Sequence, residues 1–202
     1  MIPAAELARL ERVRARTLDL VGGLSQEQLD RRPAGGGWSV GEVLDHLLRA
    51  EAANRAVIAE LIGLARAGRR PYLQRPLTPA GLGPAFVPRG LLPFLSLPAS
   101  LMTLFIPGSV RELLVRTRLF PARAAEDLQP QPGRPAAELR RELAAALAET
   151  RDLLAANADL DYRGMVYQHP FLGANDVPAI LRLTAAHEER HQEQIEAIDR
   201  CQ

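Results

Sequence analysis

The chain has 202 residues, of which 47% are hydrophobic, so it is long enough and apolar enough to bury the core of one globular domain. Its 25 basic and 24 acidic residues leave a net charge of +1, which argues against a partner such as nucleic acid or an anionic membrane surface. Every basic residue other than histidine is an arginine, so mechanisms that need a phosphate-loop lysine or a Schiff-base lysine are excluded.

The first predicted helix spans about residues 4–20, where apolar side chains recur every three or four positions among Arg and Glu. Ser25 and Gln28 match a capping box, which predicts a short turn of helix. Pro33 and the glycines at 35–37 then break the backbone, so we expect a loop before the next long helix.

The second long helix has the clearest start in the sequence. Ser39 and Glu42 form another capping box, and Trp38 and Val43 stand at the two positions of a hydrophobic staple. An apolar stripe continues from there towards Gly68.

Residues 71–134 differ in character, because prolines recur throughout them and prevent a long uninterrupted helix. We interpret them as an insertion-like crossover. Residues 90–110 carry no charged side chain and are long enough to span a bilayer, but three prolines interrupt them. We therefore expect no membrane partner; this apolar stretch should cover a core or pocket, or form the contact of a homodimer.

The third long helix is predicted from Pro135 to about residue 156, and a fourth begins where Asp176 and Pro178 signal a helix start and runs towards Asp199. No convincing alternating strand is predicted anywhere in the chain. The pattern therefore indicates an all-α fold, a four-helix bundle forming one domain over residues 1–202, with the Pro-rich crossover between its second and third helices.

Cys201 is the single cysteine, so an intramolecular disulfide is excluded, and the N-terminus shows no basic start followed by an apolar stretch. A cytoplasmic location is the simplest expectation. Because Cys201 is next to last in the chain, where fraying is usual, we do not expect it to be a catalytic nucleophile.

The four histidines carry the main functional signal. His187 and His191 are four residues apart on a predicted helix, so their side chains project from one face, and His46 lies on the apolar stripe of the second helix. A single inward histidine is most often an ordinary core residue, but burying three of them without a metal would need three sets of hydrogen-bond partners. We therefore predict a metal site at His46, His187 and His191, and expect His169 to be a partly exposed loop residue.

The string from His187 to His191 also matches the H-E-x-x-H helix of zinc metalloproteases, in which the glutamate is the general base. Only eleven residues follow His191, and no sheet is predicted to hold a peptide, so we do not favour a protease. We expect Glu188 and Glu189 to lie on a solvated helix face, with the alternative that Glu188 orients an imidazole or moves a proton.

Three segments together resemble the DinB/YfiT-like four-helix metalloenzymes, over nearly the whole chain. They are Gly37-Trp38-Ser39-Val40-Gly41-Glu42-Val43-Leu44-Asp45-His46-Leu47, His169-Pro170-Phe171-Leu172-Gly173, and His187-x-x-x-His191 followed by Gln194-Ile195. The resemblance implies a metal site formed by His46, His187 and His191. It also implies a fold shared with transferases and isomerases that use bacillithiol, mycothiol or a related thiol, although the long Pro-rich segment departs from a compact member.

Three neutral imidazoles leave coordination positions open, where a bound thiol or water would become nucleophilic. Our leading hypothesis is a metal-dependent transferase that uses a low-molecular-weight thiol as cosubstrate, with arginines holding its carboxylates. The alternatives are a metal-hydroxide hydrolase and a non-catalytic, metal-stabilised stress or binding module. We expect zinc or nickel, with iron or manganese as alternatives, because imidazole binds several of these ions.

Overall fold

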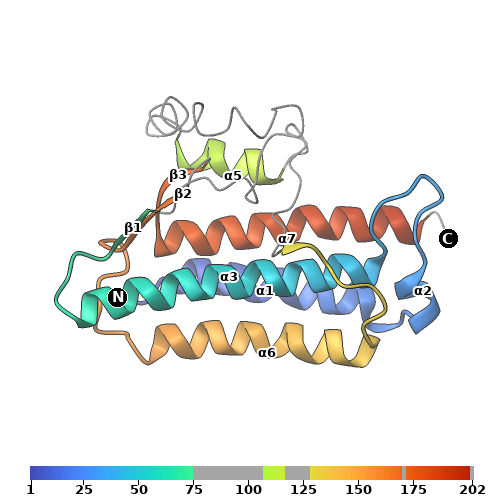
Figure 1. Ribbon diagram of the computed structural model, residues 1–202, viewed down its shortest axis with the longest axis horizontal. Helices are drawn as coiled ribbons and strands as arrows, with labels where there is room; N and C mark the ends of the chain where they lie inside the picture. The colour runs from blue at the N-terminus through green and yellow to red at the C-terminus, as the bar shows by residue number, and fades with distance from the viewer. Residues whose placement is uncertain (75–106, 117–127, 170–171, 201–202) are drawn as a thin grey trace.

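The computed structural model describes residues 1–74, 107–116, 128–169 and 172–200. Four long helices lie side by side along the molecule (Figure 1): α1 (Ala4–Gly22), α3 (Val40–Arg66), α6 (Ala136–Ala155) and α7 (Val177–Asp199). The helices α1 and α3 each pack against both α6 and α7, so α1 lies diagonally opposite α3. This arrangement confirms the predicted four-helix bundle.

The helix starts follow the signals in the sequence. Ser39 caps α3, and its side chain accepts a hydrogen bond from the backbone of Glu42, whose carboxylate bonds back to Ser39 N. The short helix α2 (Gln26–Asp30) begins with the same reciprocal arrangement at Ser25. Asp176 caps α7 through Ala179 N. Each cap satisfies backbone donors that would otherwise lack a partner, and this is why short polar motifs located these helices well.

The prediction that the chain contains no strand is wrong. A small three-stranded sheet lies at one end of the bundle (Figure 1), formed by β1 (Tyr72–Gln74), β2 (Val166–His169) and β3 (Gly173–Asp176). β2 runs parallel to β1 and antiparallel to β3. With three or four residues each, these strands are too short to show a clear alternating pattern, and β1 pairs with a segment far away in the sequence.

Within the Pro-rich crossover the structure describes the helix α5 (Gly108–Arg116), which packs against α7 (Figure 1). It has nine residues, and because most of residues 71–134 lie outside the described part of the chain, the expectation that prolines prevent long helices there stays a prediction. Most of the apolar stretch 90–110 lies outside the described residues, so its predicted role in a dimer stays a prediction. Among the helices that the structure describes, none is both long and apolar enough to cross a membrane.

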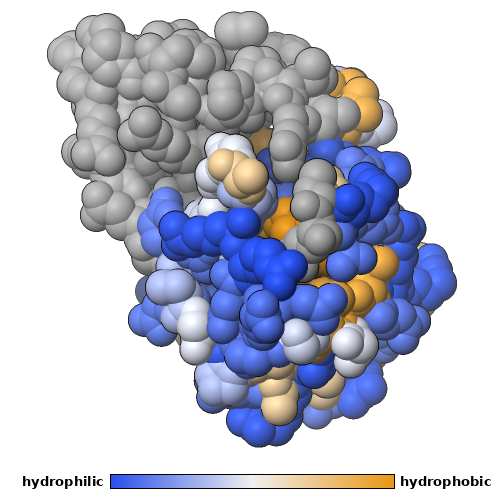
Figure 2. Space-filling model, turned by 90° about the vertical axis from the view of Figure 1, so that its right-hand side faces the viewer, coloured by the Kyte–Doolittle hydropathy of each residue, from blue (hydrophilic) through white to orange (hydrophobic). Residues whose placement is uncertain are grey.

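The apolar core consists of two clusters, one toward each end of the bundle. Between them, all four long helices contribute buried polar side chains, which we call the polar layer. Its members are Arg14, Thr17, Glu51, Thr150, Glu188 and Gln192. Outside, hydrophilic residues cover most of the described surface at the end of the bundle that carries α2, with smaller apolar areas between them (Figure 2).

Candidate metal centre

The three predicted ligands come together where α3 faces α7. His46 lies in the second turn of α3, shortly after the Ser39 cap, and His187 and His191 occupy successive turns of α7. His46 and His191 are buried and His187 is half-buried. The two helices pack against each other, so their inward faces bring the imidazoles into one cluster.

The ring nitrogens meet closely. His187 Nε2 lies 3.3 Å from His46 Nε2 and 3.2 Å from His191 Nε2, and one nitrogen from each of the three rings lies within 4.8 Å of the other two. Zinc–imidazole bonds of ~2.0–2.1 Å in a tetrahedral site place two ligand nitrogens ~3.3 Å apart. Two of the three nitrogen pairs therefore have the spacing of ligands on one ion, and the three side chains together could hold a transition-metal ion.

Two of the rings are held in the form that a metal requires. The Nδ1 of His46 lies 2.9 Å from the carbonyl oxygen of Leu128, and the Nδ1 of His191 lies 2.9 Å from Oε1 of Gln194. Because both partners are acceptors, each Nδ1 carries the proton and donates it. Each Nε2 then keeps a lone pair that points into the cluster, as in metal sites whose ligands are oriented by a second hydrogen bond.

Burial also favours the neutral rings. It lowers the pKa of His46, although the bond to Leu128 acts in the opposite direction, and the charge of Arg190 lowers it further. The pKa of His187 is lowered well below its usual value by burial and by the neighbouring His191 and His46. Because only the neutral imidazole has a free lone pair, these shifts keep the ligands available at neutral pH.

Trp38 is a site residue that the sequence reasoning missed. It was predicted only as part of the helix staple, but its ring centre lies 4.8 Å from that of His46 and 6.4 Å from that of His191. It therefore forms an aromatic wall beside the imidazoles.

Arg190 was also missed. Its Nη2 lies 3.0 Å from Nε2 of His191, so a guanidinium reaches the nitrogen cluster itself. In the sequence Arg190 is one of many arginines, and nothing in its spacing distinguishes it from those on the surface.

The expectation that Glu188 lies on a solvated helix face is wrong. Its side chain is 1% exposed, and its carboxylate accepts hydrogen bonds from Arg14 at 2.8 and 2.9 Å and from Thr17 at 2.6 Å. These partners are on α1, whereas the imidazoles face α3. Glu188 therefore does not take the position of the general base in an H-E-x-x-H protease.

Glu189 is 21% exposed and pairs with Arg9 at 3.1 Å, so it too is less solvated than expected. His169 is half-buried, but it ends strand β2 and does not lie in a loop. Its Nδ1 accepts a hydrogen bond from Leu172 N at 3.1 Å, and burial lowers its pKa to about 4. It does not belong to the cluster of three histidines.

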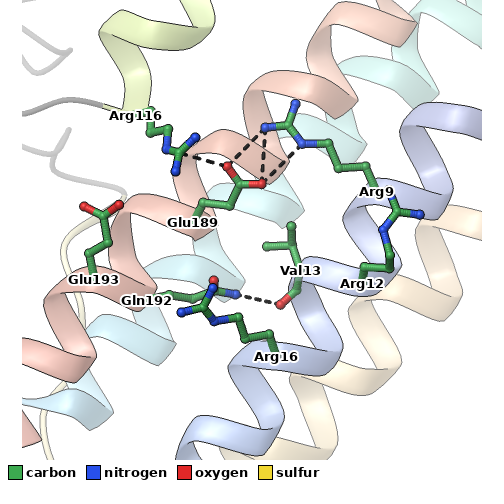
Figure 3. A pocket seen from close by; sticks show the side chains of 8 residues that line it. All are labelled: Arg9, Arg12, Val13, Arg16, Arg116, Glu189, Gln192 and Glu193. Carbon is green, nitrogen blue, oxygen red and sulfur yellow. Dashed lines mark hydrogen bonds and ion pairs between the residues drawn. The ribbon is translucent and has the colours of Figure 1, made fainter.

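A pocket of about 450 Å³ lies in the groove between α1 and α7 (Figure 3). Its α7 lining residues, Glu189, Gln192 and Glu193, are two to six positions after His187, which places them ~140–240° around the helix from it. The pocket is therefore on the opposite face of α7 from the imidazoles. Three of its four arginines approach carboxylates: Arg9 and Arg116 approach Glu189, and Arg16 pairs with Glu196.

Comparisons with known proteins agree with this architecture. The model of the DinB superfamily matches residues 9–195. Among curated proteins no match is found. A solved structure of YfiT from Bacillus subtilis, described as a probable metal-dependent hydrolase with an unusual four-helix bundle topology, is similar in fold. The similarity has a TM-score of 0.56 with 16% sequence identity and covers 98% of this chain and 86% of YfiT.

Proposed function

This chain belongs to the DinB superfamily, and we propose that it is a metal-dependent enzyme whose His46, His187 and His191 hold one divalent transition-metal ion. The observation that carries the proposal is the meeting of three Nε2 atoms, two of them on rings whose Nδ1 is engaged elsewhere. Three nitrogen donors suit zinc or nickel, and iron or manganese are alternatives.

The reaction that we propose is the transfer of an electrophilic substrate onto a low-molecular-weight thiol. In it a carbon–sulfur bond forms, the bond from that carbon to its leaving group breaks, the leaving group takes the electron pair, and the thiol proton passes to solvent. An ion with three protein ligands would supply open positions at which a coordinated thiol or water loses its proton near neutral pH.

The chain's own residues would orient and shield the reactants. Leu128 and Gln194 hold His46 and His191 in fixed tautomers, and Trp38 forms an apolar side to the cluster. In the described part of the chain no carboxylate joins the three histidines within ligand distance. A thiol, with a usual pKa of ~8.5, needs less help from a general base than water does, and this favours the transferase.

Hydrolysis is the second candidate, because YfiT, which shares the fold, is described as a probable metal-dependent hydrolase. The two candidates differ in one requirement: hydrolysis proceeds without added thiol.

Elemental analysis tests the metal site first. Protein purified without a histidine tag should contain close to one equivalent of a transition metal, and His187→Ala should contain little. Equal metal content in the two proteins would contradict the proposed site.

An activity assay then tests the reaction. Thiol consumption is measured against a panel of electrophiles, with His46→Ala as the control. We expect consumption that needs both the electrophile and His46; equal rates in the two proteins would rule out the transferase. Product formation without thiol would favour the hydrolase.

A further inference from the structure

Arg190 places a positive charge at the edge of the proposed metal site. Its Nη2 is 3.0 Å from Nε2 of His191, and its charge lowers the pKa values of both His46 and His187. The guanidinium therefore contacts the nitrogen cluster at His191. It is half-buried, in surroundings where a charge acts more strongly than in bulk water.

The hydrogen bond between Arg190 and His191 uses an electron pair that a metal ion would need. The Nδ1 of His191 donates to Gln194, so Nε2 has one lone pair and no proton. Arg190 donates to that lone pair. An ion and Arg190 cannot use it at the same time, because one lone pair accepts one partner.

Metal binding would therefore turn the Arg190 donor away from His191 and leave it next to a divalent cation. An anion that coordinates the ion would be attracted by both positive charges, and it would offer an acceptor for the N–H that Arg190 no longer donates to His191. A guanidinium fork is well matched to the planar oxygens of a carboxylate and to phosphate.

On the basis of the proposed metal-dependent function, we infer that Arg190 is a specificity-determining residue that holds an oxyanion, a carboxylate or phosphate, of a ligand bound at the metal. This identifies the substrate class as small molecules that carry such a group. A thiol cosubstrate with a carboxylate belongs to this class.

The first experiment measures the affinity of Co²⁺ for metal-free protein from its visible absorption. Wild type is compared with Arg190→Gln and with Arg182→Gln, a control that removes one charge from the same helix where Arg182 pairs with Glu6. Without added anion, Arg190→Gln should bind Co²⁺ at least as tightly as wild type, because a competitor and a like charge are gone. Weaker binding would show a structural role and overturn the inference.

The second experiment titrates the Co²⁺ proteins with mercaptoacetate, 2-mercaptoethanol and inorganic phosphate. We expect Arg190→Gln to bind mercaptoacetate, phosphate or both about tenfold more weakly than wild type, the effect of losing one charge-assisted hydrogen bond. Binding of neutral 2-mercaptoethanol should not change. Arg190→Lys, which keeps the charge but not the fork, should recover part of the affinity and should melt like wild type.

Identical affinities of wild type and Arg190→Gln for both anions would overturn the role of Arg190 and leave the metal site intact. A different result would refute the proposed function itself: Co²⁺ that fails to bind, or that binds equally well after His187→Ala. The oxyanion role of Arg190 would fall with it.

Discussion

Two polar clusters lie on neighbouring faces of α7, and they differ in how completely their donors and acceptors are matched. In the polar layer, Arg14 donates to Glu188, to Glu51 at 2.6 Å and to the carbonyl of Leu143. The hydroxyl of Thr150 donates a further hydrogen bond of 3.0 Å to the carboxylate of Glu51. In the histidine cluster, by contrast, three Nε2 atoms face one another. Those of His46 and His191 carry no proton, so both are hydrogen-bond acceptors and they cannot bond to each other.

The α7 members of both clusters lie within six consecutive residues, from His187 to Gln192. Histidines four apart face α3, and Glu188 with Gln192, also four apart, face α1, because each step along a helix turns the side chain by ~100°. The comparison shows that burial alone does not mark a ligand site. In the polar layer, side chains of the same chain neutralise the buried charges, so the layer stabilises the fold. In the histidine cluster, nitrogen acceptors converge, and this is the arrangement that can bind an ion.

Electrostatics distinguish the clusters in the same way. Burial disfavours the charge of Arg14, but its bonds and charge interactions with Glu188 and Glu51 outweigh that effect and raise its pKa above the usual value. In the histidine cluster burial lowers the pKa of His46 and His187, and the rings stay neutral. Arg14 in the polar layer therefore stays charged, whereas the neutral imidazoles of the histidine cluster have lone pairs available for a metal ion.

The largest effect should come from removing the cation of the polar layer. Arg14→Met leaves Glu51 and Glu188 buried without their counter-charge, so we expect the free energy of unfolding to fall by ~3–5 kcal/mol. The melting temperature should fall by roughly 10 °C. Arg12→Met, at an exposed position of the same helix, should cost less than ~0.5 kcal/mol. Similar losses in the two variants, measured by urea denaturation, would show that the layer is not a closed charge network.

Removing a ligand should affect stability only through the metal. At an ion concentration 100 times Kd, wild type should gain ~2.7 kcal/mol of unfolding free energy, and His187→Ala should gain almost none. The measurement is urea denaturation with and without Zn²⁺ or Ni²⁺. His169→Ala, outside the cluster, is the control and should keep the full gain. A gain that survives His187→Ala would place the ion elsewhere.

A variant of Glu188 tests whether this residue belongs to the polar layer alone or also takes part in the reaction at the proposed metal site. Glu188→Gln keeps the shape but loses the charge-assisted bonds to Arg14, so we expect it to lower the free energy of unfolding by about 2 kcal/mol. Metal content and turnover should be retained. If Glu188 were a general base, turnover would fall by roughly 10²–10⁴-fold, and a steady-state assay would detect this loss.

The smallest effect concerns the orientation of one ligand. Gln194→Leu removes the acceptor of His191 Nδ1, and we expect about tenfold weaker metal binding in competition with a coloured chelator. Gln194→Glu, which keeps an acceptor at the same place, should bind close to wild type. An unchanged affinity in Gln194→Leu would mean that His191 needs no orientation.

The sequence predicted what depends on local patterns. Helix caps at Ser25, Ser39 and Asp176, and the spacing of His187 and His191, are visible within a few residues. Long-range partners were not predictable in this way. Glu188 resembled a surface residue because its partners Arg14 and Thr17 lie more than 170 positions away, and nothing nearby in the sequence indicated them.

The sequence did not predict the strands or the two site residues Trp38 and Arg190, for related reasons. β1 is three residues long and pairs with residues 166–168, so no local alternation announced it. Trp38 was explained by its role next to the Ser39 cap, although one aromatic ring can serve both a helix start and a site. Arg190 stood among many arginines, and only the folded arrangement separates it from them.

The main-chain oxygen that orients His46 has a consequence for how the chain can vary. Leu128 contributes its carbonyl and not its side chain, so most substitutions at this position should leave the imidazole held as before. Inserting or deleting a residue next to it would shift that oxygen along the chain and release the ring. This point is therefore tolerant of changes in residue identity and intolerant of changes in length, even though it lies near the end of the segment that holds most of the chain's prolines.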